Sequence, residues 1–74
     1  MAIRISTRQL QRAAERAAES VGIPMADLWP ELTAGIGWGI YRRFGNGRQT
    51  IAEALTGREA FQLLRGIEIG ATLR

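Results

Sequence analysis

The chain contains no cysteine, no histidine and no lysine among its 74 residues. Disulfide bonds are therefore excluded, and so are the common zinc and copper sites, which depend on thiolate or imidazole ligands. The usual nucleophiles and general bases of enzymes, and Schiff-base chemistry at lysine, are excluded with them. The seven carboxylates are scattered along the sequence rather than paired. We therefore expect a protein that is not an enzyme and that holds no metal and no cofactor.

The shortness of the chain limits the core that it can bury. Seventy-four residues form one domain, residues 1–74, and domains of this size are marginally stable unless a disulfide, a metal or a partner supplements the core. With the first two excluded, the sequence favours self-association or the binding of a partner protein.

Long hydrophobic runs are also absent. The most apolar segment, residues 28–41, is too short to span a bilayer and contains Pro30 and Glu31. No secretory signal is recognisable near the first residue. The expected location is cytoplasmic, and membrane binding is not expected.

Two segments carry clear helix signals. Ser6 and Gln9 form a capping-box pattern before a run rich in alanine, glutamine, arginine and glutamate, and Gly22 ends that run. These signals predict a helix over 7–21. A second capping-box pattern, at Thr56 and Glu59, predicts a last helix with residues after Glu68 extended or frayed.

The central segment has two interpretations. Apolar residues recur every four positions from Leu32 to Phe44, after a proline that suits a helix start, which favours a helix. Residues 48–55 then read as a further short helix. The resulting prediction is an all-α bundle of three to five short helices, with a short strand or arm at 2–5 as an optional addition. Three alternating glycines favour the alternative, an α+β fold with a hairpin at 36–51.

Two surfaces are candidate binding sites. If the central segment is helical, Ala34, Trp38 and Tyr41 share a face opposite the core and form an aromatic partner-binding surface. A glycine loop flanked by arginines is a candidate nucleic-acid or anion site, because glycine loops can aim backbone amides at a phosphate. Its residues are Arg42, Arg43, Gly45, Asn46, Gly47 and Arg48. The plainer interpretation is a glycine turn with arginines at a helix end.

A third basic feature lies near the start of the chain. Arginines recur every four residues from Arg4 to Arg16, and all ten basic residues are arginine. Glu15 and Glu19 can pair with this row, which would make it an exposed ion-paired face.

The sequence thus predicts a non-enzymatic interaction protein, a small regulator, inhibitor or assembly factor that binds a protein partner or forms a homo-oligomer. The first alternative is a nucleic-acid-binding module that uses the arginines around the Gly-Asn-Gly loop. The second is a cationic membrane-active peptide. The motifs do not identify a family.

Overall fold

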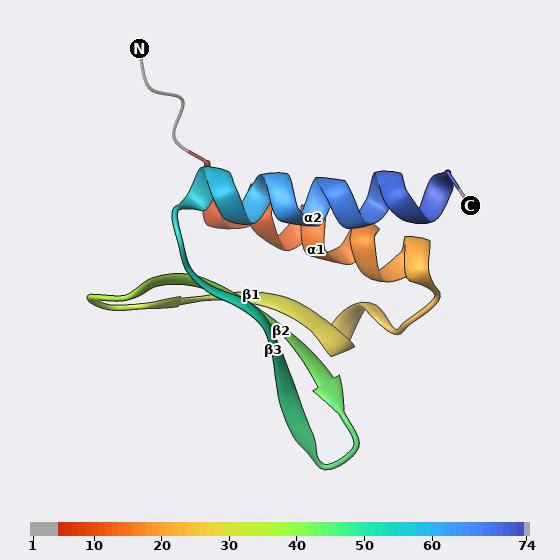
Figure 1. Ribbon diagram of the computed structural model, residues 1–74, viewed down its shortest axis with the longest axis horizontal. Helices are drawn as coiled ribbons and strands as arrows, with labels where there is room; N and C mark the ends of the chain where they lie inside the picture. The colour runs from red at the N-terminus through yellow and green to blue at the C-terminus, as the bar shows by residue number, and fades with distance from the viewer. Residues whose placement is uncertain (1–4, 74) are drawn as a thin grey trace.

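Two helices lie side by side on one face of a three-stranded antiparallel sheet in the computed structural model, which describes residues 5–73 (Figure 1). The expected all-α bundle is therefore wrong, and the fold is α+β. In chain order the elements are α1 (Thr7–Val21), the short 3₁₀ helix η1 (Met25–Asp27), β1 (Leu28–Thr33), β2 (Gly37–Phe44), β3 (Gly47–Leu55) and α2 (Gly57–Thr72). The strand or arm expected at 2–5 lies outside the described residues except for Ile5.

Both helix starts are confirmed by their hydrogen bonds. The Gln9 amide donates to Ser6 Oγ at 3.2 Å, and the Ser6 amide donates to Gln9 Oε1 at 2.8 Å. Thr56 and Glu59 exchange the same pair of bonds at the start of α2. Each box satisfies two amides that a helix start would leave without partners. The helix α2 continues to Thr72, so the expectation of an extended or frayed end after Glu68 is wrong.

The glycines explain why the central segment is a strand. Gly35 has a φ of 77° and Gly37 a φ of 119°, and neither value belongs to a right-handed helix. Gly35 instead occupies the turn between β1 and β2, which the Ile36 amide closes by donating to the Thr33 carbonyl at 3.1 Å. The four-residue apolar recurrence is not a buried face, because only Ile40 is buried while Leu32, Ile36 and Phe44 are exposed.

The hairpin of the alternative prediction is present, and it is longer than 36–51. Phe44 pairs with Gly47 across a two-residue turn whose first residue, Gly45, has a φ of 60°. Glycine at this position suits the II′ turn, whose twist matches that of paired strands. Residues 48–55, expected to be helical, form most of β3. Pro30, expected to begin a helix, lies in the edge strand β1, where a missing amide is tolerated.

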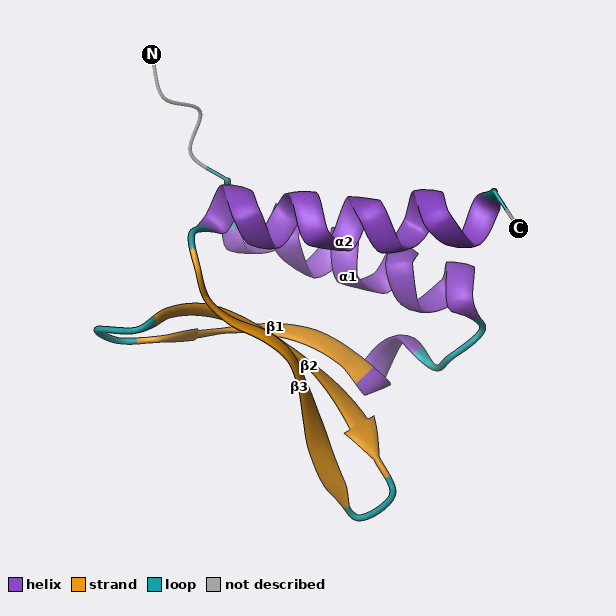
Figure 2. Cartoon of the chain, viewed as in Figure 1, coloured by secondary structure: helices purple, strands orange, loops and turns teal. Residues whose placement is uncertain are grey.

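The core lies between the helix layer and the sheet, and it is small. The fully buried large side chains are Leu10, Leu28, Ile40 and Leu64. On α1 the rest of the buried face is alanine, so α2 and the sheet can approach closely. Both helices begin at the same end of the molecule and run in the same direction, and the far end of the β2–β3 hairpin curves away from them (Figure 2). The two layers therefore separate at the end where the helices finish.

Candidate binding surfaces

The three residues of the expected aromatic surface do not form one face. Trp38 is half-buried and packs against the core beneath the helices, whereas Tyr41 is buried outside that core. They lie three residues apart on β2, which places them on opposite faces of the sheet. Ala34 is exposed in the turn between β1 and β2. The predicted surface required a helix over this segment, and the segment is a strand instead.

Tyr41 instead centres a cluster on the sheet face that points away from the helices. Its ring centroid lies 6.2 Å from that of Trp29, the residue opposite it on β1. The Arg48 guanidinium carbon lies 4.4 Å from the centre of the Tyr41 ring, and Arg48 Nη1 donates to Glu31 Oε2 at 3.0 Å. These contacts cover the tyrosine on a face that has no helix above it, so the cluster stabilises the sheet.

The residues of the expected anion site lie close together but are turned in different directions. Arg43, Arg48 and the Gly45-Asn46-Gly47 turn line a shallow cleft beside Trp29. Arg43 Nε lies 3.6 Å from Asp27 Oδ1, and Arg48 is bound to Glu31. Arg42 lines a different cavity, on the helix side of the sheet. Both arginines of the cleft are thus already paired with carboxylates, and anion binding there stays a prediction.

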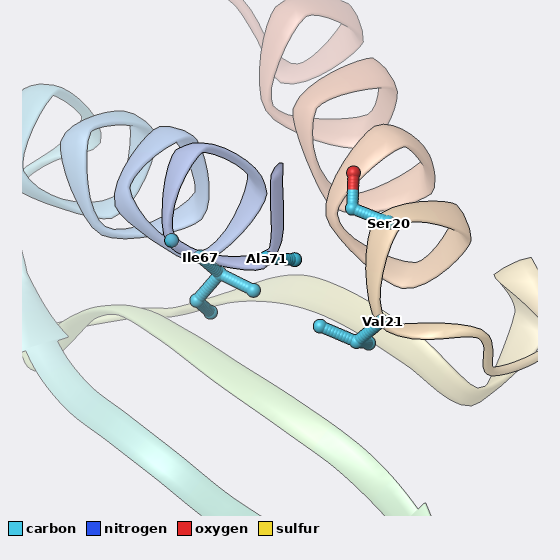
Figure 3. Close-up of a pocket in the computed structure, with 5 residues that line it drawn as sticks. Ser20, Val21, Ile67 and Ala71 are labelled. Carbon is cyan, nitrogen blue, oxygen red and sulfur yellow. The ribbon is translucent and has the colours of Figure 1, made fainter. Parts of the chain in front are cut away.

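An open groove lies where the two layers separate, and we call it the end groove. Its wider part, of about 350 Å³, is lined by Ser20, Val21, Ile67, Gly70 and Ala71. Its deeper part, of about 210 Å³, is lined by Val21, Ile23, Leu28, Arg42, Ile51 and Ile67. Figure 3 shows Val21 and Ile67 pointing toward each other from the two helices, above the strands, while Ser20 points away. The deeper part is bounded mainly by aliphatic side chains.

Exposed apolar side chains surround the end groove. Val21 and Ile51, which line it, are 47% and 40% exposed. Ile69 on α2 and the C-cap residue Leu73 are also exposed, but they follow Ile67 by two and six residues and therefore point away from the groove. Phe44 is 68% exposed and lies two residues beyond Arg42 on β2, hence on the same face of that strand. The part of the groove beside the strands, together with Phe44, therefore forms an apolar surface that residues 5–73 leave open.

A second cleft lies between the two helices, and we call it the arginine cleft. It measures about 190 Å³ and is lined by Gln9, Arg12, Ala13, Arg16, Phe61 and Arg65. Among the described residues, the three arginines have no carboxylate within 4.0 Å. Within residues 5–73, no ion pair joins Arg8, Arg12 or Arg16 to Glu15 or Glu19. Like charges four residues apart on a helix, as in Arg12 and Arg16, destabilise it by about 0.2–0.5 kcal/mol.

The sequence indicated part of the arginine cleft, but it did not indicate the end groove. The four-residue spacing of the arginines indicated that Arg12 and Arg16 share a helix face, whereas Arg65 joins them only through the packing of α2 on α1. Arg4 lies outside the described residues. The end groove could not be predicted because it requires the hairpin and the helix ends to be placed in space. Among the described residues there is no group of three or more metal-ligating side chains.

The fold and these surfaces define a small two-layer α+β protein with an open groove at one end, a cleft between its helices and a shallow cleft beside Trp29. Compared with models of known protein families, with curated proteins and with solved structures, the chain has no significant match. No helix in residues 5–73 is long and apolar enough to cross a membrane. Residues 35–40, the Gly-Ile-Gly-Trp-Gly-Ile segment on which the membrane-active alternative depends, form a turn and the first half of β2, with Ile40 buried.

Proposed function

We propose that this chain is a non-enzymatic interaction protein that self-associates through the end groove. The observation that supports the proposal is an apolar groove between the layers, bordered by exposed aliphatic side chains that no described residue covers. Exposed apolar surface of this kind marks interaction sites in proteins of this size. The cytoplasmic location and the lack of catalysis expected from the sequence remain part of the proposal.

A second copy of the chain is the occupant that fits best. Phe44 is an exposed aromatic side chain beside the groove, on the same face of β2 as the groove residue Arg42. Each copy therefore has a groove and, next to it, an aromatic side chain that could fill the groove of another copy. A twofold axis between two copies would place each Phe44 in the groove of the other copy, which gives a closed and self-complementary contact.

The strand edges offer a weaker route to self-association. The edge strand β1 contains Pro30, which has no amide to donate to a neighbouring strand. The other edge strand, β3, has register irregularities opposite Trp38–Tyr41, and Ala54 has a φ of 58°. Prolines and bulges of this kind protect sheet edges from pairing with other chains. The end groove is therefore the preferred contact.

The size of the apolar surface suits a dimer held by one anchor from each copy. A phenylalanine buries roughly 150–250 Å², while a standard interface buries about 800 Å² on each partner. The remainder would come from Val21, Ile51 and Ile67, which line the groove, and from the surface around it. An anchor residue at the centre of an interface contributes about 2 kcal/mol or more, which corresponds to roughly thirty-fold in the dissociation constant.

Light scattering over a concentration series tests the proposal. The wild-type chain should show a reversible monomer–dimer equilibrium, and Phe44→Ser should weaken it by about thirty-fold or more. Leu32→Ser is the matched control, because Leu32 is 61% exposed and lies in β1 near the opposite end of the sheet. A wild-type chain that stays monomeric at millimolar concentration, or equal weakening by the two variants, would contradict the proposal.

A further inference from the structure

We propose that the arginine cleft binds the phosphate backbone of a single-stranded nucleic acid. The cleft is separate from the end groove: the two share no lining residue. The proposal rests on three features of the cleft, namely the arrangement of its arginines, the lack of compensating acids, and an aromatic floor. It does not depend on self-association.

The arginines lie on both rims of the cleft. Arg12 and Arg16 are four residues apart on α1, a rise of about 6 Å, and Arg65 faces them from α2. Arg58 lies seven residues before Arg65 and so on the same side of α2, two turns nearer the helix start. A guanidinium donates two parallel hydrogen bonds to a phosphate, and successive arginines one helical turn apart can follow successive phosphates of a strand.

No carboxylate of the described residues forms an ion pair with the arginines of the cleft. Among residues 5–73 the two ion pairs belong to Arg43 and Arg48, on the other side of the molecule. The acid that follows Arg65 by one turn of α2 is Glu68, which does not line the cleft and whose Oε1 atom is buried. An occupant with negative charge is therefore favoured, and binding it would remove the repulsion between neighbouring arginines.

The floor of the cleft distinguishes a nucleic acid from other anions. Phe61 and Ala13 form its apolar part, and Phe61 is only partly buried against the core. Arginines that follow a backbone around an aromatic ring on which a base can stack are the pattern found in proteins that bind single strands. The carboxylates of an acidic peptide could pair with the arginines, but such a peptide has no flat base that could stack on the ring of Phe61.

Fluorescence anisotropy with a labelled 20-nucleotide oligothymidine at low salt tests the proposal. Wild-type protein should bind it, and the variant Arg12→Gln/Arg16→Gln/Arg65→Gln should bind at least tenfold more weakly. The slope of log affinity against log salt concentration should fall by about one for each arginine removed that contacts a phosphate. Circular dichroism of the triple variant, whose substitutions are all on exposed side chains, checks that it is folded.

Single substitutions and competitors complete the test. Arg65→Gln should weaken binding severalfold, and more than Arg43→Gln, which tests the alternative anion site and removes a guanidinium that is already paired with Asp27. Phe44→Ser should bind the oligonucleotide as wild type does, which separates this proposal from the dimer. Equal losses for Arg65→Gln and Arg43→Gln, no binding at low salt by folded protein, a preference for a duplex of the same length, or binding of polyglutamate alone would each overturn the proposal.

Discussion

The ring of Tyr41 lies over Gly39, so closely that a Cβ atom at position 39 would come within 2.5 Å of the Tyr41 hydroxyl oxygen. The two residues are neighbours on one face of β2, and both are buried. Because Gly39 has no side chain, the Tyr41 side chain can lie along the strand over position 39. Trp29 and Arg48 then cover the ring from the neighbouring strands.

Gly39→Ala should therefore destabilise the protein. The added methyl group would meet the ring of a side chain that is only 6% exposed and has little room to move. Overpacking of this kind costs about 1–3 kcal/mol. Urea unfolding should show the loss, while Gly47→Ala, where a Cβ would meet nothing within 4 Å, should change stability by less than about 0.5 kcal/mol. Equal stability of Gly39→Ala and wild type would show that the ring is not held there.

Gly66→Ala should have the opposite effect. Gly66 is exposed in the interior of α2, and a Cβ there would meet no neighbouring atom within 4 Å. Alanine in a helix interior is about 1 kcal/mol more favourable than glycine, mostly because the unfolded chain loses freedom. Thermal unfolding should show a higher midpoint for the variant. A lower midpoint would mean that the C-terminal half of α2 is not a regular helix.

Replacing Arg48 should destabilise the protein more than replacing its ion-pair partner Glu31. Arg48→Ala removes both the stacking on Tyr41 and the ion pair with Glu31, whereas Glu31→Ala removes only the ion pair. Exposed ion pairs contribute about 0–1 kcal/mol and cation–π contacts at exposed sites about 0.5–1 kcal/mol. Arg48→Ala should therefore be the more destabilising change in urea unfolding. If Glu31→Ala costs as much, the ion pair rather than the stacking holds the arginine.

The sequence predicted both terminal helices because their signals are local. A capping box and the glycine after α1 each depend on residues within one turn of a helix end, and the structure has the first helix at the expected residues. Val21, on the last turn of α1, is nevertheless 47% exposed, because the sheet curves away before the helix ends.

The central segment was misjudged because its apolar spacing fits a helix by coincidence. The glycines, which favour the hairpin, have roles that a helix does not offer: two of them have positive φ values and the third makes room for Tyr41. Such roles depend on a turn and on a neighbour two residues away, and apolar periodicity does not report them. The end groove depends on this placement of the strands, and both clefts depend on the packing of the helices. The spacing of apolar residues therefore points to Trp38, and not to Phe44, as the exposed aromatic contact.

Isotope-filtered NMR on a mixture of ¹³C-labelled and unlabelled wild-type protein tests the end-groove dimer most directly. The chain has only two phenylalanines, so the ring signals of Phe44 can be assigned without ambiguity. The account predicts intermolecular NOEs between the Phe44 ring of one copy and the methyl groups of Val21, Ile51 and Ile67 of the other. A dimer whose intermolecular NOEs involve other residues, or a mixture that shows none at millimolar concentration, would contradict it.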